Sequence, residues 1–305
     1  MTSITTHHNT NSSNDKHDLY QNITDRIIAA IEAGVQRDGK PLWSGAGSSG
    51  MPYNQTSGKT YSGVNVLILW LAAMDNGFAS SAWLTYKQAT ELGGNIKKGS
   101  KGQQVVYYST MERDSTDHGN GEIGTRKVGF LKSYTVFNLE QCEGIDADIV
   151  TRHFHGNEAA EALLQASGAV ILEQGGKAYY RPSTDEIYMP ERSRFITDEA
   201  FYAVALHELT HWTGHPSRLD RDFSGRFGTE AYAFEELVAE LGAAFSCADL
   251  GLIPATLDGH ASYIDSWLKV LKNDKTAIFT AASQASKAHS WLMAAAANAS
   301  IRDAA

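Results

Sequence analysis

The sequence has few cysteines and lacks a long apolar run. Its 305 residues contain two cysteines, Cys142 and Cys247, which lie far apart and fit neither a metal-binding spacing nor a disulfide framework. This scarcity suits a reducing cytosol. The longest apolar run of the first half, 64–74, is interrupted by Asn65 and is too short to cross a bilayer. Residues 1–16 are polar and do not resemble a signal peptide, so the sequence predicts a cytoplasmic protein without a membrane segment.

The sequence also lacks an excess of positive charge, and its charge is unevenly divided. The formal net charge is −9. Residues 20–145 carry 12 Lys and Arg against 11 Asp and Glu, whereas residues 146–305 carry 13 against 22. This asymmetry predicts a boundary near 143–157, with a disordered extension at 1–19, one domain at 20–145 and a second at 155–305. The overall acidity argues against a dedicated DNA-coating protein.

The acidic half contains a pentad, 207–211, that reads His-Glu-Leu-Thr-His. Because His207 and His211 are four residues apart, a helix would place them on one face, one turn apart, where both can bind a single metal ion. Glu208 is then placed to act as a general base on metal-bound water. The apolar segment before the pentad and Gly214 after it predict a helix that stops at this glycine.

A zinc site needs a third protein ligand. The residues after His211 resemble the start of the metzincin signature, which requires a histidine three residues after Gly214. Ser217 occupies that position and His215 is out of register, so the sequence excludes a metzincin site.

A second helix can supply the third ligand instead. Residues 234–245 have apolar positions at helical spacing, and Glu236 and Glu240 lie one turn apart on that helix. Gluzincin-like sites use one glutamate as a ligand and an acidic residue one turn later to orient a ligand histidine. We therefore predict Glu236 as the third ligand of one Zn²⁺ and Glu240 as the orienting residue, with Glu235 as the competing ligand. Tyr232 is a candidate for oxyanion stabilisation from its proximity in sequence.

The near-neutral half has a mixed pattern of helices and strands. The expected elements are helices at 22–33, 64–74 and after 86, a loop at 39–63, antiparallel strands at 104–108 and 127–137, and a polar connecting loop at 109–125. Together with the helical half that carries the pentad, this pattern predicts a two-domain α+β protein.

A glycine-hinged turn at 96–102 carries three lysines and lies between aromatic segments. Cations that follow a backbone, combined with aromatic faces for bases, are typical of single-stranded DNA binding without sequence preference. Burial in the core is the alternative for such aromatic residues. The candidate contacts are Trp43, Tyr53, Tyr61, Trp83, Tyr86, Lys97, Lys98, Lys101, Arg126, Lys127 and Lys132.

Seven motifs occur together over nearly the whole chain beyond residue 20. They are Pro41-Leu42-Trp43, Pro52–Asn54, Tyr61–Asn65, Trp83–Gly99, Val136–Gln141, Ala205–His215 and Glu235–Glu240. In combination they resemble the ArdC-type antirestriction proteins of conjugative plasmids. The resemblance implies an N-terminal single-stranded-DNA-binding domain, a C-terminal zincin-like metallopeptidase domain, and a role in protecting incoming plasmid DNA from host restriction.

Three functions remain open from the sequence. The first is a DNA-binding module fused to a peptidase domain, whose partners are single-stranded DNA and a protein substrate such as the host restriction enzyme. The second is a cytosolic zinc metallopeptidase whose first half recognises only protein. The third is a DNA-binding pseudo-peptidase in which the metal is structural.

Overall fold

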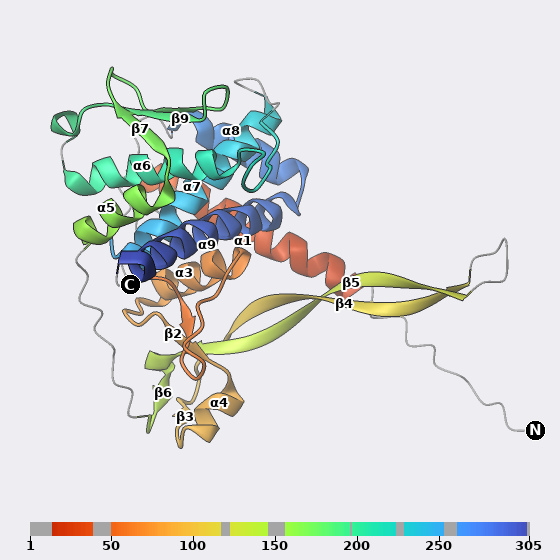
Figure 1. Ribbon diagram of the computed structural model, residues 1–305. Coiled ribbons are helices and arrows are strands. Elements are labelled where there is room, and N and C mark those ends of the chain that lie inside the picture. The colour runs from red at the N-terminus through yellow and green to blue at the C-terminus, as the bar shows by residue number, and fades with distance from the viewer. Residues whose placement is uncertain are drawn as a thin grey trace, which may run out of the picture.

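The first half of the chain folds into helices and a small sheet (Figure 1). The computed structural model describes residues 14–38, 50–116, 123–145, 156–195, 197–223, 229–252 and 261–303. The first-half elements are α1 (Asn14–Asp38), β1 (Tyr53–Asn54), α3 (Val64–Asn76), β2 (Ala82–Leu84), α4 (Tyr86–Glu91), β3 (Asn95–Ile96), β4 (Gln103–Thr116), β5 (Ile123–Asn138), a 3-10 turn (Leu139–Gln141) and β6 (Cys142–Glu143).

The predicted helices of this half are confirmed. In α1, Ile23, Ile27 and Ile31 form a buried stripe, as helical spacing requires. This helix begins at Asn14, so helix rather than the expected disorder covers 14–19. Nine of the first ten positions of α3 are buried, and the exception is Asn65, whose side-chain oxygen accepts the backbone N–H of Val106 at 2.8 Å.

Strands β4 and β5 form a long two-stranded ribbon that projects from the helices (Figure 1). The sheet has the order β1-β2-β5-β4, and β3 pairs with β6 separately. The antiparallel strands predicted at 104–108 and 127–137 are confirmed. The polar loop predicted at 109–125 is wrong, because the antiparallel register continues to the pair Thr116 and Ile123. Backbone hydrogen bonds form this ladder regardless of side-chain polarity, so a polar sequence does not end it.

The second half is mainly helical, with one small sheet. Its elements are α5 (Gly156–Ser167), β7 (Val170–Glu173), β8 (Tyr179–Arg181), β9 (Glu186–Met189), a 3-10 turn (Arg192–Arg194), α6 (Asp198–Thr213), α7 (Glu230–Leu250), α8 (Ala261–Asn273) and α9 (Ala277–Asp303). The sheet order is β7-β9-β8, with β7 parallel and β8 antiparallel to the central strand. None of the helices among the described residues combines the length and the apolar character that a membrane span requires.

The two halves share a hydrophobic core. One buried cluster combines residues of α1 and α3 with residues of α7, α8 and α9, including Ile27, Trp70, Phe245, Trp267 and Ile278. A second cluster joins α5, α6, α7 and α9 beneath the small sheet. The molecule therefore has the predicted two-domain α+β architecture, with helices of both halves packed together. The domain boundary stays a prediction, because 146–155 lie outside the described residues.

Helices α6 and α7 cross closely at Gly242. A Cβ atom there would meet Cγ2 of Thr210 at 2.5 Å, so the helices approach to a distance that only glycine permits. Gly214 ends α6 as predicted, but with a φ of −77° rather than a left-handed one. Its missing side chain instead leaves room for Phe223 and Arg221, which pack against that position.

Candidate metal centre

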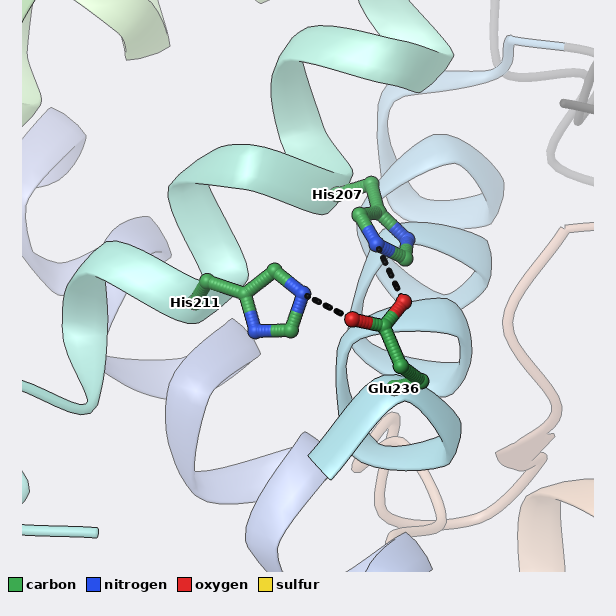
Figure 2. A group of neighbouring side chains, drawn as sticks. All are labelled: His207, His211 and Glu236. Atoms are coloured by element: carbon green, nitrogen blue, oxygen red, sulfur yellow. Dashed lines mark ion pairs between the residues drawn. The ribbon is translucent and has the colours of Figure 1, made fainter. Parts of the chain in front are cut away.

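Two helices bring His207, His211 and Glu236 together, as Figure 2 shows. The Nε2 atom of His207 lies 3.5 Å from Oε2 of Glu236, and Nε2 of His211 lies 3.5 Å from Oε1 of the same carboxylate. One potential ligand atom from each residue lies within 4.8 Å of the others, and all three residues are buried. The sequence predicted this trio as the metal ligands, and the structure places their ligand atoms side by side.

The other nitrogen of each imidazole faces a second carboxylate. Nδ1 of His207 lies 3.6 Å from Oε2 of Glu240, which is the residue that the sequence predicted to orient a histidine. Nδ1 of His211 lies 3.1 Å from Oε1 of Glu235. Glu235, considered above as a competing ligand, therefore contacts the ring nitrogen that points away from Glu236. Each ring thus lies between two carboxylates, an arrangement that fixes its orientation.

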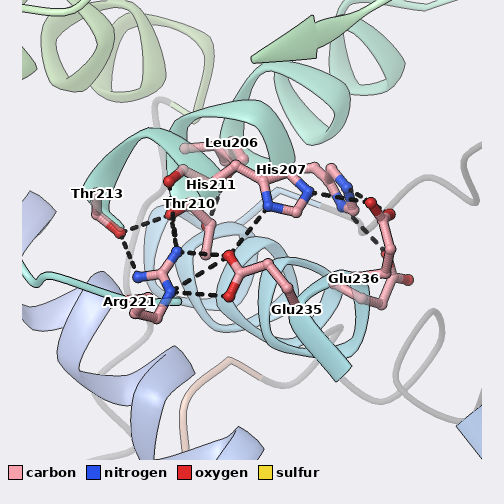
Figure 3. Close-up of polar contacts among 9 residues, drawn as sticks. Leu206, His207, Thr210, His211, Thr213, Arg221, Glu235 and Glu236 are labelled. Carbon is pink, nitrogen blue, oxygen red and sulfur yellow. Dashed lines mark hydrogen bonds and ion pairs between the residues drawn. The ribbon is translucent and has the colours of Figure 1, made fainter. Parts of the chain in front are cut away.

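Arg221 completes this network, and sequence reasoning missed it (Figure 3). Its guanidinium donates to both carboxylate oxygens of Glu235, with Nη2 at 2.9 Å from Oε1 and Nε at 3.1 Å from Oε2. It also donates to the carbonyl oxygen of Thr210 at 2.6 Å and to the hydroxyl of Thr213 at 2.9 Å. The only sequence signal was an arginine shortly after the pentad, which is indistinguishable from a surface cation without the fold.

Glu208 is buried beside the trio. Burial raises the pKa of its carboxyl, while the positive charges of His207 and His211 and a hydrogen bond from the backbone N–H of Tyr180 act in the opposite direction. Strand β8, which carries Tyr180, therefore contacts the predicted general base directly. Tyr232, the suggested oxyanion residue, is half-buried one turn before Glu236, and its role stays a prediction.

The loop after α6 is tied to the β8–β9 turn by a second arginine. Arg218 donates to Oδ2 of Asp185 at 3.0 Å and to the carbonyl oxygen of Trp212 at 2.7 Å, and it stacks 3.6 Å from the centroid of the Trp212 ring. Asp185 also accepts the hydroxyl of Tyr180 at 2.9 Å. These contacts hold β8 close to the buried glutamate.

The charges of the centre are strongly coupled. Burial alone would lower the pKa of His207, but its hydrogen bonds to Glu236 and Glu240 outweigh burial and raise that pKa to about 10. Hydrogen bonds to Glu235 and Glu236 likewise outweigh burial at His211 and raise its pKa to about 9. Burial would raise the pKa of Glu236, yet the two histidines hold it far below its usual range. The histidines therefore carry charge that balances buried carboxylates.

The donor set fits a divalent cation. Two imidazole nitrogens and one carboxylate are ligands that Zn²⁺ and similar metals accept, and three protein ligands are typical of a catalytic site. Four buried carboxylates, those of Glu208, Glu235, Glu236 and Glu240, lie at the site, and the guanidinium of Arg221 contacts that of Glu235. A dication in place of the two histidine protons would preserve the charge balance.

The predicted DNA contacts divide between surface and core. Tyr86 and the lysines at 97, 98, 101 and 132 are exposed, and Tyr53 and Tyr61 are half-buried. Trp43 lies outside the described residues, and Arg126 and Lys127 lie in β5 without described side chains. Trp83 is wrong as a base-stacking residue, because it is 1% exposed and packs in the core between α3 and the sheet.

Two exposed tyrosines were missed. Tyr107 on β4 is 60% exposed and Tyr134 on β5 is 49% exposed. In the ribbon register Tyr107 pairs with Lys132, and Tyr134 is two residues further along β5. All three side chains therefore lie on one face of the ribbon, because residues two apart on a strand share a face. The sequence signal was the alternating pattern, which does not say which face is solvent-exposed.

Comparisons with known proteins match both halves. The family model for the N-terminal domain of anti-restriction factor ArdC matches residues 17–137, and that for a zincin-like metallopeptidase matches residues 158–284. The metal-free crystal structure of the antirestriction ArdC protein from the R388 plasmid is 45% identical, covers 92% of this chain and 98% of its own, and superposes with a TM-score of 0.79. This chain belongs to the ArdC antirestriction family.

Other relatives of this ArdC family member differ in length. The Mn(II)-bound structure of the R388 protein is 44% identical over 92% of this chain and 99% of its own, with a TM-score of 0.77. The protein y4eC of Sinorhizobium fredii is 44% identical over 91% of this chain and 92% of its own. The DNA primase TraC of Escherichia coli is 38% identical over 92% of this chain, which spans only 20% of the primase.

Proposed function

We propose that this ArdC family member binds single-stranded DNA and carries a zinc peptidase centre, and that it protects incoming plasmid DNA from restriction in the cytoplasm during conjugation. The observation that carries the proposal is the buried centre of His207, His211 and Glu236 beside Glu208, in a chain 45% identical to the R388 antirestriction protein. A host restriction enzyme, or another protein, is the proposed peptidase substrate.

In the peptidase centre, His207, His211 and Glu236 would hold one Zn²⁺. When bound, the metal supplies Lewis acidity toward a peptide carbonyl. The carboxylate of Glu208 accepts a proton from the attacking water and returns it to the nitrogen of the leaving amine. The raised pKa of this buried carboxyl suits proton transfer near neutral pH better than an ordinary glutamate would. The Mn(II)-bound relative supports a divalent metal, and the two-imidazole, one-carboxylate set favours zinc.

The peptidase proposal is tested by Glu208→Gln, which keeps the size of the side chain. We expect proteolysis of an unfolded protein substrate to fall about 10²- to 10⁴-fold, since that is the contribution of general acid–base catalysis. Metal content is expected to be unchanged, because Glu208 is not a proposed ligand. An unchanged proteolysis rate in a metal-loaded Glu208→Gln variant would contradict the peptidase mechanism.

The exposed face of the ribbon supports the DNA-binding part. Tyr107 and Tyr134 offer two aromatic faces to solvent, and Lys132 lies opposite Tyr107. Bases stack on such rings without regard to sequence, and a cation beside them attracts the phosphate backbone. This face, with the lysines of 97–101, is the proposed path of the strand.

Fluorescence anisotropy with a labelled oligothymidine tests this path. We expect Tyr107→Ala and Tyr134→Ala each to weaken binding about 5- to 150-fold, the cost of about 1–3 kcal/mol per lost stacking contact. Tyr179→Ala is the matched control, because Tyr179 is also exposed, at 39%, but lies on β8 in the other half. Equal effects of the three substitutions would argue against a ribbon site.

The place of proteolysis in protection is tested in cells with Glu208→Ala. Loss of antirestriction in a stable, DNA-binding variant would support the combined function. Full antirestriction with this variant would favour a DNA-binding pseudo-peptidase in which the metal is structural. Wild-type protein that cleaves protein but shows no salt-dependent affinity for single-stranded DNA would instead favour a plain metallopeptidase.

A further inference from the structure

Arg221 is a buried cation placed behind the metal centre rather than in it. Its side chain is 5% exposed, and it lies in the loop that follows α6, against the N-terminal part of α7. A buried guanidinium is costly unless its donors are satisfied. Here the donors are directed at Glu235, at the carbonyl oxygen of Thr210 and at the hydroxyl of Thr213. The group is therefore fixed in one position by both helices.

Through its contact with Glu235, Arg221 also restricts the orientation of His211. Because the guanidinium binds both oxygens of Glu235, that carboxylate stays anionic and cannot rotate freely. Its Oε1 atom then accepts the Nδ1 proton of His211 at 3.1 Å. With the proton held on Nδ1, the Nε2 lone pair of the neutral ring points toward Glu236, where a metal would bind.

His207 has a looser arrangement. Its Nδ1 atom lies 3.6 Å from Glu240, compared with 3.1 Å between His211 and Glu235. Glu235 has the direct support of a guanidinium, which donates to both of its carboxylate oxygens. Of the two contacts, the one between His211 and Glu235 is therefore the shorter, and a guanidinium holds its carboxylate.

We propose that Arg221 is a positioning residue for the metal centre, acting through Glu235 to set the orientation and tautomer of His211. The inference rests on the proposed metal site and extends it to a residue outside the pentad and outside the glutamate helix. It makes the loop after α6, and not only the two helices, a determinant of metal affinity.

The same loop offers a matched control in Arg218. This arginine is also buried, at 8% side-chain exposure, and it also donates to a carbonyl oxygen near the end of α6 and to a carboxylate. Its carboxylate partner is Asp185, which accepts from Tyr180 rather than from a histidine of the pentad. Replacing either arginine with lysine keeps the charge and removes the paired hydrogen bonds. Only the Arg221 substitution disturbs Glu235.

The experiment measures Zn²⁺ affinity by competition with a chromophoric chelator in the full chain. We expect Arg221→Lys and Glu235→Gln each to weaken Zn²⁺ binding about 10- to 100-fold, the usual cost of losing a group that orients a ligand. Arg218→Lys is expected to leave the affinity at the wild-type value. Wild-type affinity in Arg221→Lys, or an equal loss in Arg218→Lys, would overturn the proposal.

A double variant tests whether the effect passes through Glu235. If it does, Arg221→Lys combined with Glu235→Gln should bind Zn²⁺ no more weakly than the weaker single variant. Additive losses would contradict the relay. If Arg221→Lys does not fold, Glu235→Gln alone tests the proposal, and a wild-type Zn²⁺ affinity in that variant overturns it. A wild-type protein that binds no Zn²⁺ would refute the metal site itself, which is a different result from all of these.

Discussion

Metal binding at this centre is expected to release protons, because each imidazole lies between two carboxylates. The carboxylate of Glu236 lies 3.5 Å from Nε2 of both His207 and His211, while Glu240 and Glu235 face the Nδ1 atoms. The pKa values of about 10 for His207 and about 9 for His211 mean that both rings are protonated at pH 7. A metal needs the Nε2 lone pairs, so it must displace both protons.

The number of protons released determines how strongly the metal affinity depends on pH. With two protons released per metal ion, the apparent affinity rises about 100-fold per pH unit near neutrality, or about 2.7 kcal/mol. The dependence should flatten as the pH approaches 9, where His211 begins to lose its proton in the metal-free protein. Ordinary histidines would already be mostly neutral at pH 7.5 and would give almost no dependence there.

Isothermal titration calorimetry provides the assay. Zn²⁺ is titrated into metal-free protein at pH 7 in buffers of different ionisation enthalpy, and the slope of the observed enthalpy gives the number of protons released. Glu208→Gln is the control, because Glu208 is a buried carboxyl of the centre whose own pKa is raised, and the number of protons released should remain at two without it. A slope of zero in the wild-type protein would refute the reasoning.

Three further outcomes are expected. The melting temperature of the metal-free protein should fall as the pH rises through about 9 to 10. The reason is that His207 and His211 bind their protons more tightly in the folded protein than in the unfolded chain. The stability that this contributes is complete below about pH 6.5 and is lost above the folded-state pKa values. Crowding against Thr210 in Gly242→Ala should lower the free energy of unfolding by about 1–3 kcal/mol in denaturant unfolding, and the higher helix propensity of alanine should offset up to about 1 kcal/mol of this loss. Adding Thr210→Ala should relieve the crowding in the double variant. Lys132→Ala should reduce the salt dependence of single-stranded DNA binding by about 0.7 in the log–log slope, and an unchanged slope would place the phosphate contact elsewhere.

Much of the centre could be predicted from sequence because it is built on two regular helices. The spacing of His207 and His211 places them on one face of any helix, and the apolar pattern of 234–245 predicts a helix with Glu236 and Glu240 one turn apart. The sequence could not separate the roles of Glu235 and Glu236, because adjacent residues on a helix differ by about 100° in direction. Only the crossing of the two helices determines which one faces both Nε2 atoms.

The features that were missed depend on contacts distant in sequence. The relation of Arg221 to Glu235 is set by a loop that returns to the crossing of α6 and α7, which no local pattern encodes. Trp83 was wrongly predicted as a DNA contact because the sequence of a short strand does not show whether a helix covers its aromatic residue. In the structure α3 covers it. The predicted strands of the ribbon were too short because its outer part has a polar sequence without the alternation that a buried sheet face would require.

The most direct test of the metal centre is the metal content of three proteins after saturation with Zn²⁺ and removal of the free ion. We expect one Zn²⁺ per chain in the wild type, loss of stable binding in Glu236→Gln, and about one per chain in Glu235→Gln, whose affinity is lowered but whose ligands are intact. The same ligand atoms lie within 4.8 Å of one another in the structure. Absence of metal from the wild type, or its loss from Glu235→Gln with retention in Glu236→Gln, would contradict this centre.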